Sequence, residues 1–288
     1  MKLEGILPAA LTPLNSDETL NTKAFEALIE HLYGEGVDGL YVCGNTGEGL
    51  LLPVDVREKA TEVAVKNSPA GKQIIVHTGA YRAQDAIRLS AHASRTGVAA
   101  VSALPPGTSY NFGETKAYYE AIATASANAP VLIYYFPSMA PPLSIEQMET
   151  LCDIPNVAGL KFTSFDFYTM RQLLLRGEIV FNGPDEMLAA GLLMGAHGGI
   201  GSTYNVMPKL FVELYAHARA HRWAEAVAMQ DRINSLIRIL LSMPLIPALK
   251  QIMTWRGIPC GEAVEPRRTL TTEETTRLKA ELERWERA

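Results

Sequence analysis

Short apolar, β-branched runs alternate with longer stretches of helical period along most of this chain. Runs of this kind are typical of buried strands, whereas apolar positions that recur every three or four residues are typical of helices. We therefore expect strands at residues 5–11, 39–43, 74–77, 99–103, 131–135, 157–161, 179–181 and 198–200. Helices are expected between them, at 22–35, 53–66, 83–95, 113–127, 144–151, 168–176 and 184–194.

The regular alternation of strand and helix predicts a parallel sheet that closes into a (β/α)₈ barrel. The alternative is an open doubly wound sheet, which would have fewer strands and a glycine-rich phosphate turn after the first one. The first strand instead runs into Thr12, Pro13 and Leu14, without such glycines. A closed barrel is therefore favoured.

The strand pattern ends after about residue 205, and only helical patterns follow, at 208–220, 223–241, 245–255 and 272–287. No polar linker divides the chain. We predict an α/β protein, with a TIM barrel over residues 1–220 and a C-terminal helical extension of the same unit over 221–288.

Composition narrows the classes of function. The 288 residues are 48% hydrophobic and carry a net charge of −5 without a basic run, which disfavours nucleic-acid binding. Glu4 and Pro8 interrupt the apolar centre that a signal peptide needs, and the longest apolar stretch, 233–249, contains one arginine and two prolines. We expect a cytoplasmic protein that binds no membrane.

Metal and redox signatures are not found in the sequence. The three cysteines are widely spaced and form no CxxC pair, and no HExxH or two-histidine–carboxylate motif occurs. Reduced thiols and a site without metal are expected.

Residues at the carboxyl ends of barrel strands face the active site. That rule selects a set of candidates from the sequence alone, namely Thr12, 44–48, His77, 105–110, Tyr134, Tyr135, Lys161, Thr163, 183–186 and 201–204.

Lys161 is the most informative of these candidates because it ends an apolar strand. Burial would disfavour its charged form and lower its pKa, and a neutral amine can attack a ketone to form an iminium, the electron sink of aldol cleavage. The alternative is a strand-end lysine that reaches water or pairs with a carboxylate such as Asp166. Position alone leaves both interpretations open.

Other candidates are equally ambiguous when taken singly. The phenol of Tyr134 could move a proton beside Lys161, or Tyr134 and Tyr135 could both be core residues. Residues 44–49 could form an anion-binding nest or a plain turn. Asp185 and Glu186 could serve as rim carboxylates or as first-turn helix residues.

Several segments together resemble one family. Residues 44–48, the run from Tyr134 to Pro137, and residues 159–163 and 183–201 have the order and spacing of the dihydrodipicolinate synthase/N-acetylneuraminate lyase superfamily. The segment 198–205 and the pair Asp185-Glu186 are similar to the neuraminate lyase branch. Dihydrodipicolinate synthases carry an arginine where this chain has Met139, which disfavours that activity.

The resemblance implies a role for each matching residue. Lys161 would form a Schiff base with a 2-oxo acid, and Tyr134 would transfer the proton during cleavage to pyruvate and N-acetylmannosamine. The resemblance further implies that no cofactor is needed, that the protein is a homotetramer, and that Tyr110 would reach a neighbouring subunit's site. The pyruvate carboxylate would be held by Asn45, Thr46 and Gly47, and the rest of the sugar acid by Thr163, Gly183, Asp185, Glu186 and Ser202.

Three departures from the family pattern bear on the substrate. Asn45 stands where the lyases usually have serine, residues 105–110 lack the usual aromatic pair, and Pro141-Pro142 changes the loop after the fifth strand. These changes keep open an aldolase or dehydratase for another 2-keto-3-deoxy sugar acid. A catalytically silent barrel that binds a sugar acid is the alternative outside enzymes.

Overall fold

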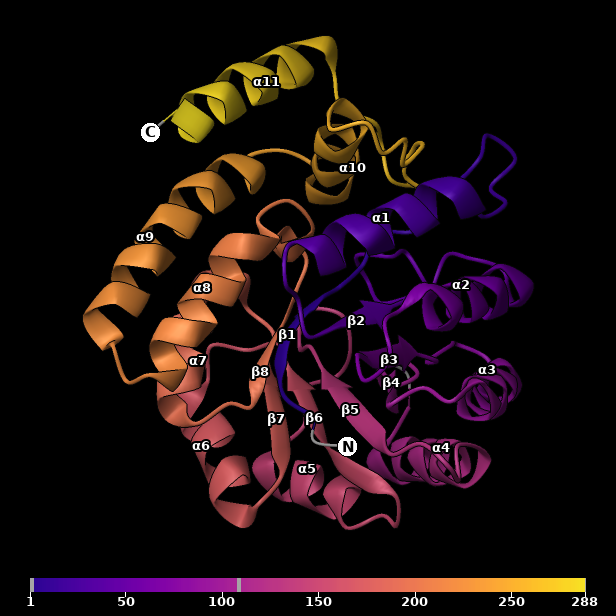
Figure 1. The fold of residues 1–288 in the computed structure, drawn as a ribbon. Helices are drawn as coiled ribbons and strands as arrows, with labels where there is room; N and C mark the ends of the chain where they lie inside the picture. Colours follow the sequence, from indigo (N-terminus) through magenta and orange to yellow (C-terminus); the bar gives the residue numbers. More distant parts are fainter. Residues whose placement is uncertain (1–2, 108–109, 288) are drawn as a thin grey trace.

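The computed structural model describes residues 3–107 and 110–287, and in this part of the chain the expected barrel is confirmed (Figure 1). Eight strands pair in the order β1-β8-β7-β6-β5-β4-β3-β2, with parallel pairs between neighbours. The strands are β1 Gly5–Pro8, β2 Gly39–Val42, β3 Gln73–His77, β4 Ala100–Ala103, β5 Val131–Tyr135, β6 Val157–Phe162, β7 Ile179–Asn182 and β8 Gly198–Gly201.

Backbone contacts between β1 and β2 bring the two ends of the sheet together. The Asp38 amide donates to the Ile6 carbonyl at 3.0 Å, and the Ala10 amide donates to the Tyr41 carbonyl at 2.9 Å. The first strand is shorter than the predicted 5–11, because the buried Asn205 side chain binds the backbone beyond Pro8. Its Oδ1 accepts from the Leu11 amide at 3.1 Å, and its Nδ2 donates to the Ala9 carbonyl at 2.8 Å.

The helices lie within two residues of the predicted bounds at most ends, and they surround the sheet (Figure 1). They are α1 Thr22–Gly34, α2 Val54–Asn67, α3 Ala83–Thr96, α4 Phe112–Ala125, α5 Ile145–Cys152, α6 Phe167–Arg176, α7 Leu188–Met194, α8 Pro208–Arg219, α9 Trp223–Leu240, α10 Leu245–Trp255 and α11 Thr272–Arg287.

The prediction of one helix over 184–194 was wrong at its start. Residues Asp185–Met187 form a separate 3-10 turn, η1, before α7 begins at Leu188. The physical reason is the side chain of Asp185, which accepts hydrogen bonds from the backbone and hydroxyl of Thr203 at 2.7 and 2.6 Å. This tie to the β8 loop fixes Asp185 outside the helix.

The C-terminal extension packs on the barrel beside this turn, with α9 against α8 and α11 against α9 (Figure 1). Gln230 of α9 accepts from the Ala189 amide at 3.0 Å and donates to the Asp185 carbonyl at 3.1 Å. Asn234, one turn further on, donates to the Glu186 carbonyl at 3.1 Å. The extension therefore fixes the loop that follows β7.

Two layers of apolar side chains form the core. The larger cluster lies between the sheet and the helices, and a smaller one, which includes Tyr41, Tyr134 and Phe181, fills the barrel interior. No single described helix is long and apolar enough to cross a membrane, while α9 and α10 pass that test only as a pair bent by 108°.

Asn205 provides a direct test of how the first strand is held. Replacing Asn205 with Ala removes its side-chain bonds to the Leu11 amide, the Ala9 carbonyl and the Ser202 carbonyl. The first two buried groups are left unpaired, while the Ser202 carbonyl still accepts from the backbone amide of residue 205. We expect the free energy of unfolding to fall by about 3 kcal/mol, measured by urea denaturation. The control Asn111→Ala removes an exposed helix cap and should cost about 1 kcal/mol. Equal losses in the two variants would contradict this account.

Candidate active site

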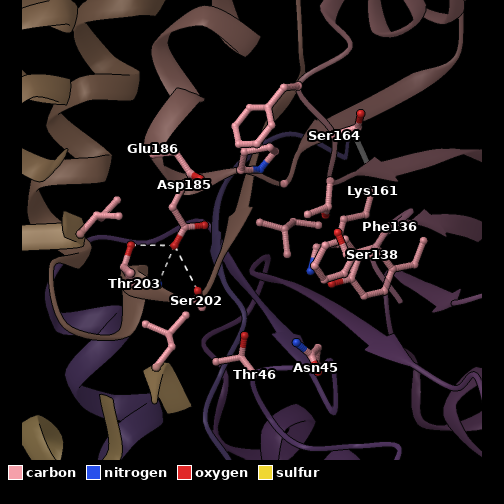
Figure 2. Close-up of a pocket in the computed structure, with 18 of the residues that line it drawn as sticks. Asn45, Thr46, Phe136, Ser138, Lys161, Ser164, Asp185, Glu186, Ser202 and Thr203 are labelled. Atoms are coloured by element: carbon pink, nitrogen blue, oxygen red, sulfur yellow. Dashed lines mark hydrogen bonds between the residues drawn. The ribbon is translucent and has the colours of Figure 1, made fainter. Parts of the chain in front are cut away.

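A cavity of about 320 Å³ opens at the carboxyl ends of the strands (Figure 2). Nine of the residues that the family resemblance assigned to the site line it: Asn45, Thr46, Tyr134, Lys161, Thr163, Gly183, Asp185, Glu186 and Ser202. Pro184 and Thr203, from the wider set of strand-end candidates, line it as well. The structure therefore brings together residues that the sequence distributes over more than 150 positions, from 45 to 203.

Lys161 is placed in the barrel interior by the register of β6, where it lies between Tyr134 of β5 and Phe181 of β7. Its side chain is 4% exposed. The amine nitrogen lies 4.1 Å from the ring centroid of Tyr134 and 4.2 Å from that of Tyr41. Among the described residues this nitrogen forms no ion pair.

The alternative partner considered for Lys161 is engaged elsewhere. Asp166 caps α6 by accepting from the backbone and hydroxyl of Thr169 at 3.0 and 2.7 Å. Burial lowers the pKa of Lys161 to about 7, and the nearby Asp185 carboxylate opposes that shift. A large fraction of the amine is then neutral, and so nucleophilic, near pH 7.

Tyr134 lies against Lys161 in the interior layer and packs edge-on to Tyr41 and His77, with ring centroids 6.0 and 5.9 Å away. Burial raises its pKa well above the usual range, so the hydroxyl remains protonated and able to donate. Tyr135 faces the opposite side of the strand and stacks on Phe162 in the outer layer. Of the two tyrosines, Tyr134 alone lines the cavity.

The turn after β2 presents Asn45 and Thr46 to the cavity but not Gly47. The carbonyl of Gly47 instead accepts a hydrogen bond from the Thr12 hydroxyl at 2.7 Å, which anchors the turn to the end of the first strand segment. Gly47 was expected to contact substrate. The structure gives it a place in the turn's backbone, outside the cavity lining.

Asp185, Ser202 and Thr203 line the wall of the cavity that lies across from Lys161 (Figure 2). Besides its bonds to Thr203, Asp185 accepts from the Ser202 hydroxyl at 3.3 Å. Burial raises the pKa of this carboxyl to about 6, and the Thr203 hydrogen bonds work against the shift. The wall thus presents a carboxylate and hydroxyls, which suit the hydroxyl groups of a sugar.

Thr163 and Gly183 form a matched pair. A Cβ on Gly183 would lie 2.0 Å from the Thr163 hydroxyl oxygen, so only glycine leaves room for it. This hydroxyl is buried and forms no well-aligned hydrogen bond in the described part of the chain, but it lies close enough to the Tyr134 phenol to lower the pKa of that group. Thr163 is therefore placed to orient the Tyr134 hydroxyl and to contact a ligand bound beside it.

Several cavity residues were not predicted from the sequence. Ser164 and Phe165 directly follow Thr163, so extending the strand-end rule by two residues would have found them. Ile237 lies on α9, Leu241 lies between the two helices, and Leu245 begins α10. No local motif in the helical extension indicates that these residues line a cavity.

Tyr110 does not line the cavity and is 45% exposed. Its proposed contribution to a neighbouring site stays a prediction. Thr108 and Ser109, also in the predicted loop 105–110, lie outside the described residues. Within residues 3–107 and 110–287, no group of three or more His, Cys, Asp or Glu side chains could hold a metal ion.

The fold and this cavity together define a class, the (β/α)₈-barrel enzymes with a buried lysine as candidate nucleophile at the barrel mouth. More specifically, the chain belongs to the dihydrodipicolinate synthetase family, whose model matches residues 2–285. The superfamily expected from the sequence is thereby confirmed.

Several known proteins are similar to this chain over nearly its whole length. The chain is 37% identical over 270 residues to the N-acetylneuraminate lyase of Rhizobium meliloti, with 92% of this chain and 90% of the relative covered. The structure of the Ruminococcus gnavus sialic acid aldolase matches with a TM-score of 0.94 at 27% identity, covering 99% of this chain and 97% of the other. The N-acetylneuraminate lyase of Proteus mirabilis matches with a TM-score of 0.92 at 29% identity, covering 99% of both chains.

The lowered pKa of Lys161 predicts how covalent capture of pyruvate depends on pH. Because the neutral amine is the reactive form, the rate should rise with pH through about 7 and then level off. Asp185 raises the pKa of Lys161, so Asp185→Asn should move the midpoint to lower pH. Intact-mass analysis of samples quenched with borohydride measures the rate. A midpoint near the ordinary lysine value of about 10.4 would contradict the prediction.

Proposed function

We propose that this protein is a Schiff-base-forming aldolase that cleaves N-acetylneuraminate to pyruvate and N-acetylmannosamine. The observation that carries the proposal is the buried Lys161 amine, which has no ion-pair partner in the described chain and lies beside Tyr134. This amine faces a cavity whose far wall is rich in hydroxyl groups. The relatives named N-acetylneuraminate lyase and sialic acid aldolase support it. One structure of the Ruminococcus gnavus enzyme is of a catalytic lysine mutant.

The reaction begins at the nitrogen of Lys161. The neutral amine attacks the C2 ketone of the open-chain sugar acid, and loss of water gives an iminium. When the C4 hydroxyl loses its proton, the C3–C4 bond breaks and its electron pair moves toward the iminium nitrogen, which gives an enamine and releases the aldehyde. Protonation at C3 and hydrolysis of the iminium then yield pyruvate and restore the amine.

Tyr134 is proposed to move the proton. In the iminium its phenol lies next to the reacting carbons, because its ring already contacts the Lys161 nitrogen. Its raised pKa keeps the phenol protonated, so it can accept the C4 proton only while it gives up its own. We propose that both transfers occur in concert with bond cleavage, with the phenolic proton passing to the carboxylate of the bound substrate. Neighbouring polar groups of the bound substrate would complete the relay.

The two ends of the substrate are proposed to bind at different walls. Asn45 and Thr46 would hold the carboxylate, since both line the cavity at the end of β2. The hydroxyl and N-acetyl groups would contact Asp185, Glu186 and Ser202, with Thr163 and Gly183 between the two ends. A homotetrameric assembly, a cytoplasmic location and the domain division at residue 220 remain predictions of the sequence analysis.

The proposal predicts pyruvate release from N-acetylneuraminate by the purified protein. A coupled lactate dehydrogenase assay measures it, with 2-keto-3-deoxygluconate assayed in parallel. Turnover of N-acetylneuraminate, at a higher kcat/KM than 2-keto-3-deoxygluconate, is the expected result. Release from 2-keto-3-deoxygluconate alone would move the protein to another sugar-acid aldolase.

A matched variant tests the assigned proton transfer. Tyr134→Phe keeps the ring that contacts Lys161 and removes only the hydroxyl. We expect kcat for cleavage to fall by at least about 100-fold, while pyruvate still forms an adduct on Lys161. Full cleavage activity in this variant would remove Tyr134 from the mechanism.

A further inference from the structure

Three charged side chains meet behind the turn that presents Asn45 and Thr46. Glu48, which is fully buried, has one carboxylate oxygen 2.7 Å from the Lys250 amine of α10. Its other oxygen accepts from the Val264 amide at 2.9 Å and lies 3.5 Å from the Nε of Arg267. The segment that follows α10 is thus docked on the turn by one buried carboxylate.

The charges in this cluster do not cancel. Lys250 is 2% exposed, and its amine also donates to the Glu262 carbonyl at 2.7 Å, so it already neutralises Glu48. Arg267, whose side chain is 33% exposed, adds a second positive charge beside the same carboxylate. One positive charge is left over next to the cavity, where it attracts an anion.

Arg267 also contacts the cavity lining directly. Its Nη2 donates to the side-chain oxygen of Asn45 at 3.2 Å. A guanidinium has only donors, so the oxygen of the Asn45 amide must face it, and the NH₂ group is left for other partners. In Figure 2 the amide nitrogen of Asn45 points toward the space enclosed by the labelled side chains.

We infer that Arg267 is a positioning residue for recognition of the substrate carboxylate. By holding the Asn45 oxygen it orients the amide donors toward the carboxylate of a 2-oxo acid, and its charge strengthens that contact. This inference rests on the proposed function. It assigns to the C-terminal extension a share in substrate specificity, through a side chain that does not itself line the cavity.

The neighbouring residue offers a matched control. Arg268 carries the same charge, but its guanidinium is bound to Glu274 and the Thr269 carbonyl and does not contact the turn. Arg267→Met and Arg268→Met therefore remove the same charge from adjacent positions, and only the first releases Asn45.

The experiment measures the half-saturating concentration for adduct formation with pyruvate and with methyl pyruvate, which lacks the negative charge. In Arg267→Met we expect about a tenfold increase for pyruvate, which corresponds to the loss of one hydrogen bond to a charged group. The value for methyl pyruvate should change less than about twofold, and Arg268→Met should match the parent for both ligands. Arg267→Lys keeps the charge near Glu48, but it lacks the guanidinium whose several N–H groups can contact Glu48 and Asn45 at once. This variant should also weaken pyruvate binding.

A second background separates positioning from general structural support. The Asn45→Ser variant lacks the side chain that Arg267 orients. Adding Arg267→Met to this variant should therefore raise the half-saturating concentration of pyruvate by a smaller factor than adding it to the parent protein. Equal weakening of pyruvate and methyl pyruvate, or equal effects in both backgrounds, would overturn the inference and leave Arg267 with a structural role.

Failure of the proposed function and failure of the Arg267 inference give different results in this experiment. No pyruvate adduct in the parent protein would overturn the proposed function and this inference with it. A normal parent adduct with Arg267→Met indistinguishable from Arg268→Met would overturn only the role of Arg267. If Arg267→Met melts at a much lower temperature than the parent, Arg267→Lys decides between the outcomes.

Discussion

The site depends on one constraint, the burial of the Lys161 amine without an ion-pair partner in the described chain. A charged amine in that position loses its hydration and gains only the faces of two aromatic rings and the more distant Asp185 carboxylate. The neutral form is favoured as a result. Lys250 of the same molecule is also buried, but its amine lies 2.7 Å from the carboxylate of Glu48, which stabilises the charged form.

The barrel maintains this constraint by close packing around the mouth. Gly183 leaves room for the Thr163 hydroxyl, and Gly201 does the same for Asp185, since a Cβ there would lie 2.2 Å from the Asp185 carboxylate. Asp185 is in turn anchored by Thr203, so its charge acts on Lys161 from a fixed distance rather than by direct pairing. The candidate nucleophile is thus placed by strand β6, and its electrostatic neighbour by the turn η1, which is tied to the loop after β8.

The fold and most of the site could be predicted from the sequence because strand ends in a parallel barrel converge on one face. That rule predicts one shared site for Lys161, Tyr134 and Asp185, and all three line the same cavity. Segment 184–194 was mispredicted as one helix because a hydrogen bond from a distant loop decides the conformation of Asp185. Asn45 and Arg267 are 222 positions apart, and local pattern gives no sign that they meet. The apolar wall formed by Ile237, Leu241 and Leu245 was missed for the same reason, since it depends on how the extension docks.

The most direct test of this account is to treat the protein with pyruvate and borohydride and to map the adduct by peptide mass analysis. Lys161 and Lys250 then serve as an internal comparison, because both are buried and only Lys250 has a carboxylate partner among the described residues. The account predicts a single reduced pyruvate adduct, on Lys161, and none on Lys250. An unmodified Lys161 under conditions in which pyruvate saturates the protein would contradict it.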